Sequence, residues 1–184
     1  MTQEGWVDEV LGFWFSELGP ADWYAGGEAL DRKIESRFAP LHARLKTELL
    51  AAAIDDARTA LAAVIVLDQF PRNIFRGRAE AFSSDDLAID IARRALDKGF
   101  DAALGNDEKA FLYMPFMHSE VLADQERCID LFRGLDNEEG LKYAIEHRDI
   151  VAEFGRFPHR NRVLGRESSR AELEFLESHP GYGQ

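Results

Sequence analysis

Cysteine is nearly absent from this chain of 184 residues, because Cys128 is the only one. A single thiol excludes an internal disulfide and any metal cluster built from several cysteines. It fits a reducing compartment, so a cytoplasmic location is expected. Long apolar runs are missing too. The clearest one, Ala60 to Leu67, has eight residues, far fewer than the ~20 that a membrane-spanning helix needs.

Positive charge is also scarce. Lysine and arginine number 22 against 34 aspartates and glutamates, so the net charge is −12 and the isoelectric point is near 4.9. Neither nucleic acid nor an anionic membrane is expected as a partner, since both need a basic face. Residues Met1 to Gly5 lack the basic start and apolar run of a signal peptide, so no targeting segment is expected.

The alternating pattern of β-strands is missing, whereas helical periodicity runs along the whole chain. Apolar spacing predicts helices over 2–18, 30–41, 41–50, 56–70, 87–96, 106–132, 141–154 and around 173–176. Pro40 and Pro115 are expected to break or kink their helices. Ser83 with Asp86 and Ser169 with Glu172 predict capping boxes. Asp55 or Asp56 is expected to cap the 56–70 helix, and Gly99 is expected to end the 87–96 helix in a left-handed conformation. The chain is therefore predicted to be a single all-α domain, 1–184, of antiparallel helix pairs, with a frayed tail over 179–184.

Polar groups enter the predicted core in the stretch from Ala60 to Gly77. The apolar run is followed within six positions by Asp68, Gln69, Arg72 and Asn73. A helix that is apolar all round is a buried helix. This helix should therefore cross the core and deliver polar groups at its far end, where Pro71 is expected to stop it.

Arginines gather in two short segments of this acidic chain. Eight of the 17 lie there: Arg72, Arg76, Arg78, Arg148, Arg156, Arg160, Arg162 and Arg166. Guanidinium groups bind phosphate or carboxylate through two parallel hydrogen bonds, so one interpretation is an anion site. The other is that these arginines pair with the chain's own carboxylates and with helix-end carbonyls.

Three histidines are candidates for chemistry. His118 and His147 lie on apolar helical stripes, a position typical of hydrogen-bonded core histidines. His159 differs, because it lies among arginines beside Arg160 and Asn161. It is the best candidate for a ligand contact or a proton-transfer group.

Metal and nucleophile chemistry find little support in the sequence. His118 and Glu120, like His147 and Asp149, are two residues apart, which places them on nearly opposite faces of a helix. No His-Glu-x-x-His or Cys-x-x-Cys pattern occurs, so neither a metal site nor a cofactor is expected. Cys128 lies on an apolar stripe and is interpreted as an inert core thiol.

Three longer motifs resemble a known family. They are Leu67–Asn73 (LDQFPRN), Phe111–Glu120 (FLYMPFMHSE) and Phe154–Asn161 (FGRFPHRN). In this order they are similar to a bacterial family of unknown function, domain-of-unknown-function family 924, over nearly the whole chain. The resemblance implies an all-α fold of the tetratricopeptide-like superfamily. It implies no activity.

These motifs are expected to meet in one polar site, because buried polar groups must find partners. The predicted ligand-binding residues are Asp68, Arg72, Asn73, His118, Glu120, His147, Arg156, His159, Arg160 and Asn161. The leading hypothesis is a binding domain for a small anionic molecule or an acidic peptide terminus. One alternative is a hydrolase or transferase on an anionic substrate, with His159 or His118 as acid/base. The other is a purely structural or protein-interaction role, and the oligomeric state stays open.

Overall fold

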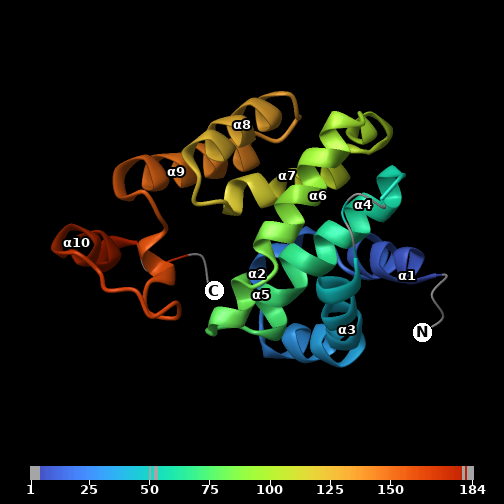
Figure 1. The fold of residues 1–184 in the computed structure, drawn as a ribbon, viewed down its shortest axis with the longest axis horizontal. Helices are drawn as coiled ribbons and strands as arrows, with labels where there is room; N and C mark the ends of the chain where they lie inside the picture. The colour runs from blue at the N-terminus through green and yellow to red at the C-terminus, as the bar shows by residue number, and fades with distance from the viewer. Residues whose placement is uncertain (1–4, 50, 52–53, 180, 182–184) are drawn as a thin grey trace.

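The computed structural model describes residues 5–49, 51, 54–179 and 181, and among them it contains helices and no strand. The all-α prediction is confirmed. The tetratricopeptide-like arrangement stays a prediction. Figure 1 shows the N-terminal helices gathered on one side of the molecule and the segment from about residue 155 onward on the opposite side, with α8 and α9 above it.

The predicted first helix, 2–18, corresponds to α1 (Trp6–Gly12) and a π-helical turn that continues it to Glu17. Residues 2–4 of that prediction lie outside the described part of the chain. A short helix, α2 (Pro20–Ala25), follows, and then α3 (Glu28–Glu48). The predicted break at Pro40 is wrong, because α3 runs straight through it. Pro40 and Ser36 are both exposed, so the carbonyl that loses its intrahelical partner faces water.

The central helix begins as α4 (Ala57–Val64), where the carboxylate of Asp56 accepts from the Thr59 amide at 2.9 Å, as predicted. It continues through a π-helical turn, η3 (Ile65–Gln69), into α5 (Phe70–Ile74). The prediction that Pro71 stops this helix is therefore wrong. In the π turn the Phe70 amide bonds five residues back, to the Ile65 carbonyl, so the hydrogen-bond register has already shifted before the proline.

Ser84, a residue distant from Pro71 in the sequence, explains why this proline is tolerated inside the core. Pro71 has no N–H to give to the buried Leu67 carbonyl four residues before it. That carbonyl accepts instead from the Ser84 hydroxyl at 2.6 Å. Ser84 precedes α6 (Asp85–Asp97), and its side chain makes no cap bond to that helix. The predicted Ser83–Asp86 capping box is therefore wrong.

The second half of the chain starts at Gly99, which adopts the predicted left-handed conformation with φ 69°. Then come α7 (Asn106–His118) and α8 (Leu122–Arg133). Pro115 was expected to kink or restart the helix. It lies within α7, and the break between the two helices comes after His118 instead. Because α7 ends there, its last histidine lies at a helix terminus.

A four-residue turn leads from α8 to α9 (Glu138–Phe154), which ends at Gly155 with φ 69°. A 3-10 turn over Pro158–Arg160 follows, and then α10 (Arg170–Ser178). The Ser169–Glu172 capping box is confirmed. The expected frayed tail falls mostly on residues 180 and 182–184, which lie outside the described part of the chain.

Two apolar clusters hold the helices together. The larger one is built on aromatic rings from α3, α5, α7 and the first helix. The Phe38 and Phe70 rings stack at 4.6 Å, and the Trp14 and Phe111 rings meet edge to face at 5.3 Å. The smaller cluster, around Phe157, joins α9 to α10. The two arginine-rich segments approach each other at Asp85, whose carboxylate lies within 4 Å of both Arg72 and Arg160.

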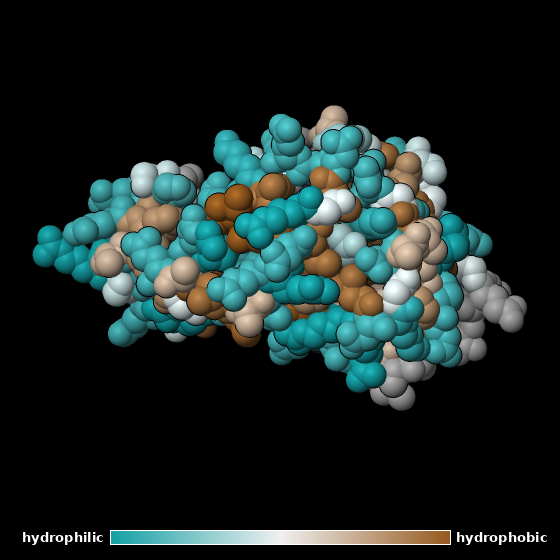
Figure 2. Space-filling view, turned by 90° about the horizontal axis from the view of Figure 1, so that it is seen from above, coloured by the Kyte–Doolittle hydropathy of each residue, from teal (hydrophilic) through white to brown (hydrophobic). Residues whose placement is uncertain are grey.

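Hydrophilic side chains cover most of the face shown in Figure 2, and apolar ones appear between them in separate areas. Among the described helices, none is both long enough and apolar enough to cross a bilayer.

Candidate functional site

Asp68 and His118 form the innermost pair of the polar region. Asp68 comes from the π turn η3 and is completely buried, while His118 is the last residue of α7. The His118 Nδ1 lies 2.8 and 3.0 Å from the two carboxylate oxygens. The Gln69 amide donates to the same carboxylate. A carboxylate at Nδ1 holds the proton on that nitrogen, so Nε2 carries the lone pair.

The charges around this pair set its protonation. Burial acts to raise the pKa of Asp68, but Arg72 and His118 outweigh burial and hold it below its usual range. Burial, with the positive charge of Arg72, lowers the pKa of His118. At neutral pH the pair is therefore a carboxylate bonded to a neutral imidazole.

Arg72 links this pair to α6. One terminal nitrogen lies 3.4 Å from Asp68, and two hydrogen bonds of 3.1 Å reach the two oxygens of Asp85, the first residue of α6. The same guanidinium also donates to the Asp68 backbone carbonyl. Arg72 thus joins the far end of the central helix to the start of α6, and its charge is balanced within the protein.

Arg160 approaches the same carboxylate from the second arginine-rich segment. Its guanidinium carbon lies 4.5 Å from the centre of the Phe82 ring and 4.6 Å from that of Phe157, so two aromatic rings hold it. Its side chain is 6% exposed, and its closest carboxylate oxygen, on Asp85, is 3.6 Å away. Among the described residues, no acceptor lies within hydrogen-bond distance of its side-chain N–H groups, and its buried Nε is one of the orphaned donors.

The burial of Arg160 lowers the affinity of its guanidinium for a proton. Burial, and then the nearby charge of Arg72, lower its pKa to about 10. The guanidinium remains cationic at neutral pH. A buried cation without hydrogen-bonded acceptors is costly, and this is the least satisfied charge in the region.

Glu120 closes one side of the region. Its carboxylate accepts from Arg166 at 2.6 and 2.9 Å and from the Phe157 backbone amide at 2.8 Å. Burial acts to raise the pKa of Glu120, but the bonds from Arg166 and Phe157 hold it below its usual range. Glu120 is therefore a structural anion that fixes the start of the Pro158–Arg160 turn.

His147 and His159 flank the Phe157 ring, each with its ring centre 5.5 Å away. His147 donates from Nδ1 to the Tyr143 carbonyl at 2.8 Å, since a backbone oxygen only accepts. Burial is the main cause that lowers the pKa of His147 to about 3 and that of His159 to about 4, and Arg160 adds to both shifts. Both imidazoles are neutral at neutral pH.

Three residues predicted for the ligand site are committed to other partners. Asn73 donates to Asp31 of α3 at 2.8 Å. Arg156 makes two bonds to Glu172 of α10, at 2.6 and 2.8 Å. Asn161 is 1% exposed and bonds with Ser168 and Arg166. These side chains support helix packing, because the protein's own side chains use the groups that a ligand would need.

The contacts among Asp68, Arg72, His118, Glu120, Arg160 and their partners are named here the polar network. Beside it the surface is hollowed to a volume of about 390 Å³, a space named here the Arg78–Arg162 hollow. Phe82, Pro158 and His159 form the wall it shares with the network, and Leu173 and Leu176 of α10 form another wall. Sequence reasoning counted Arg78 and Arg162 among the clustered arginines but did not assign them to a site. Only the fold reveals that residues about 85 positions apart face one space.

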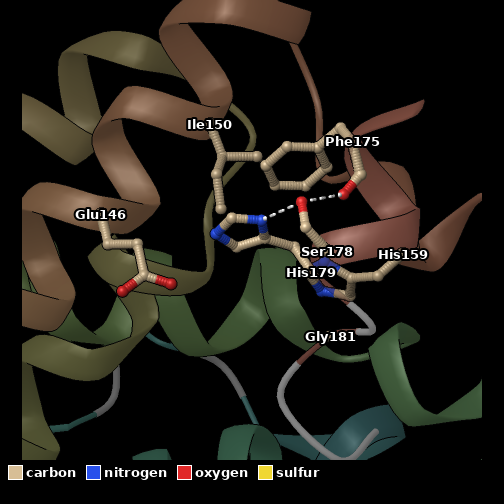
Figure 3. A pocket seen from close by; sticks show the side chains of 7 residues that line it. All are labelled: Glu146, Ile150, His159, Phe175, Ser178, His179 and Gly181. Carbon is tan, nitrogen blue, oxygen red and sulfur yellow. Dashed lines mark hydrogen bonds between the residues drawn. The ribbon is translucent and has the colours of Figure 1, made fainter. Parts of the chain in front are cut away.

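A smaller hollow, of about 110 Å³, lies on another side of His159 (Figure 3). Glu146 and Ile150 of α9 line it opposite Phe175 of α10 and His179, the residue that follows α10. Ser178 bonds both to the Phe175 carbonyl and to the His179 ring. His159 therefore lies between two surface hollows.

The described residues include no group of three His, Cys, Asp or Glu side chains arranged to hold a metal ion. Cys128 is buried, and burial raises the pKa of its thiol well above the usual range.

Comparisons with known proteins identify the family of this chain. A family model described as "Bacterial protein of unknown function (DUF924)" matches residues 10–180. The chain belongs to this family. A solved structure, the protein of unknown function ATU0120 from Agrobacterium tumefaciens, is 39% identical and superimposes with a TM-score of 0.88, covering 94% of this chain and 97% of that chain. No curated protein matches the chain.

The DUF924 match includes every residue of the network, from Asp68 to Arg166. The family and the Agrobacterium protein are both described as being of unknown function. The function of this DUF924 member must therefore be argued from its own side chains.

Proposed function

We propose that this DUF924 protein binds a small anion, a phosphate or a carboxylate, on the guanidinium of Arg160. One observation carries the proposal. Arg160 is a buried cation in contact with two aromatic rings, yet its side chain makes no hydrogen bond to the described residues and its buried Nε is an orphaned donor.

The internal carboxylate does not serve as that acceptor. Both oxygens of Asp85 already accept from Arg72 at 3.1 Å. The 3.6 Å separation between Asp85 and Arg160 is longer than a hydrogen bond. An external oxyanion would give Arg160 the bidentate partner that its planar fork fits.

The aromatic clamp supports binding in a second way. The Phe82 and Phe157 rings both lie against the guanidinium and hold it in place. A side chain already fixed in position loses little conformational entropy on binding. The Arg160 side chain is therefore preorganised for an acceptor that lies in its own plane.

Binding should be linked to protonation of the neighbouring histidines. His147 and His159 are neutral without a ligand, partly because of the charge on Arg160. A bound anion offsets that charge and raises both pKa values. Proton uptake then accompanies binding at pH values near or below these raised pKa values, so affinity should rise as pH falls towards them, and added salt should weaken it.

Isothermal titration with inorganic phosphate and with acetate tests the proposal on wild type and on Arg160→Lys. The lysine keeps the charge and loses the fork, so we expect about tenfold weaker binding, equivalent to one charged hydrogen bond. Arg94→Lys is the matched control, because Arg94 is half-exposed and pairs with Asp90 on the surface. Binding that is absent in wild type, or equal in both variants, would leave Arg160 as an internal partner of Asp85.

One observation favours the enzyme alternative enough to test it. The Asp68–His118 pair fixes the imidazole tautomer and leaves Nε2 as a proton acceptor, an arrangement used in general-base catalysis. A turnover screen with phosphate esters and acyl esters checks this role. Activity that disappears in His118→Ala but survives in His42→Ala, another buried histidine, would support it. Activity that is unchanged in His118→Ala would remove the assignment.

A further inference from the structure

We propose that the Arg78–Arg162 hollow is a second binding site, for an amphipathic carboxylate with one carboxylate group joined to an apolar chain or side chain. Arg160 does not line this hollow, so the proposal goes beyond anion binding by Arg160 and stands on separate residues.

The first argument is the pairing of the clustered arginines. Six of the eight lie within 4 Å of a carboxylate oxygen: Arg72, Arg76, Arg148, Arg156, Arg160 and Arg166. In the described part of the chain no such partner lies near Arg78 or Arg162. These two arginines, one from each arginine-rich segment, line the same hollow.

The second argument is the charge of the lining. Among the described residues that line the hollow there is no aspartate or glutamate, although the protein carries a net charge of −12. Its two arginines therefore create a local positive potential on an acidic molecule. An anion is attracted to this hollow and repelled by most of the remaining surface.

The third argument is the apolar part of the lining. Leu173 of α10 is 55% exposed, so its side chain is available to a ligand. It lines the hollow together with Leu176, Val163 and the Phe82 ring. A ligand with an apolar part would remove this surface from water at about 25 cal/mol per Å².

The guanidinium of Arg78 is also held in place by neighbouring groups, while its charge stays available to a ligand. Its guanidinium lies over the Phe75 ring at 5.0 Å and donates to the Ile74 carbonyl at 3.0 Å. One amino group is therefore anchored, and the other N–H groups have no acceptor in the described structure. The hollow's volume of about 390 Å³ lies within the range of small-molecule sites, about 300–1,000 Å³. Two arginines suit one carboxylate better than the repeated phosphates of a polynucleotide.

Fatty acids and peptide C-termini ending in an apolar residue share this chemistry. Calorimetry with octanoate, and with a tripeptide ending in leucine, represents the two sources. Octanol is the probe that lacks the carboxylate, and acetate is the probe that lacks the apolar chain. We expect octanoate or the free-acid tripeptide to bind, the amidated tripeptide and octanol to bind at least tenfold more weakly, and acetate to leave this hollow empty.

Variants separate this site from Arg160. Arg78→Gln and Arg162→Gln should each weaken octanoate binding about tenfold, the equivalent of one charged hydrogen bond, and Leu173→Ser should weaken it as well. Arg170→Gln is the matched control, because Arg170 is 93% exposed on the same helix as Leu173. Arg160→Lys should leave octanoate binding unchanged while it weakens phosphate binding.

Three results would overturn the proposal. They are octanol binding as tightly as octanoate, Arg78→Gln and Arg162→Gln binding like wild type, or no amphipathic carboxylate binding at all. The loss of octanoate binding in Arg160→Lys alone would also refute it, because the carboxylate would then occupy the Arg160 site. Failure of phosphate binding with octanoate binding intact would refute only anion binding by Arg160.

Discussion

Asp68→Asn is the most informative single substitution, because it changes charge at the centre of the network with almost no change in shape. Asp68 is completely buried and accepts from His118 and Gln69 through its side chain. Its negative charge, with that of Asp85, balances the cations Arg72 and Arg160. The asparagine leaves this region with one excess positive charge and turns an amide N–H₂ toward a group that donates.

The expected loss is about 3 kcal/mol in the free energy of unfolding. Removing one partner of a buried ion pair costs about 3–5 kcal/mol. The lower end applies here, since Arg72 keeps its two bonds to Asp85. For a chain of this size each kcal/mol shifts the melting temperature by about 2–4 °C, so a drop of roughly 6–12 °C is expected.

Urea unfolding followed by far-ultraviolet circular dichroism measures this change. Asp90→Asn is the matched control, because Asp90 pairs with Arg94 four residues later, as Asp68 pairs with Arg72, but on an exposed surface. The control should lose no more than about 0.5 kcal/mol. Equal losses in the two variants would refute the argument that burial makes the Asp68 pair strong.

The pH dependence of the difference is a second test. The folded state lowers the pKa of Asp68 from its ordinary value of 3.8. Its ionisation therefore contributes stability that is present above about pH 4 and is lost as pH falls below that value. The difference in free energy of unfolding between wild type and Asp68→Asn should become smaller as pH falls. A gap that stays constant from neutral pH to pH 3 would contradict the assigned direction of the shift.

Other substitutions test the local arguments. Ser84→Ala should lower the free energy of unfolding by about 1–3 kcal/mol in urea titration, because the buried Leu67 carbonyl loses its donor; no loss would mean that water replaces the hydroxyl. Gly155→Ala should cost about 1–2 kcal/mol, since φ is 69° there. Gly12→Ala, at helical φ with no atom within 4 Å of a new Cβ, should gain up to about 1 kcal/mol, and thermal unfolding that reverses this order would refute both. Because the folded pKa of His159 is about 4, its contribution to stability should fall as pH drops below about 6.5, and an NMR titration that finds a normal pKa would contradict it.

The helices were predictable where periodicity and caps are local. Asp56, Gly99 and the Ser169–Glu172 box act within one turn of chain, so the sequence is enough to place them. The proline predictions failed for a nonlocal reason. Whether a helix continues through Pro71 depends on which group donates to the Leu67 carbonyl, and that donor, Ser84, lies 17 residues further along the chain, just before α6.

The candidate site was predictable in part. Asp68 and His118 come together, and Arg160 lies beside Phe157, within the segments that the motifs marked. The sequence did not distinguish arginines that face internal carboxylates, such as Arg156, from those without one in the described structure, such as Arg162. That distinction depends on which acidic residue lies nearby in three dimensions, and the chain has 34 of them.

The π-helical turn sets the direction in which the side chains after it point around the axis of the central helix. Each residue of an α-helix advances the next by about 100°, and the π turn inserts one residue into that progression. The part before the turn, α4, packs against α6 and α7, and the part after it, α5, packs against α3. Deleting one residue between Ile65 and Gln69 would keep the helix and most of its apolar surface. It would nevertheless rotate Arg72 and Asn73 away from their carboxylates, so the count of residues in this helix, as much as their identity, determines where the site's charges point.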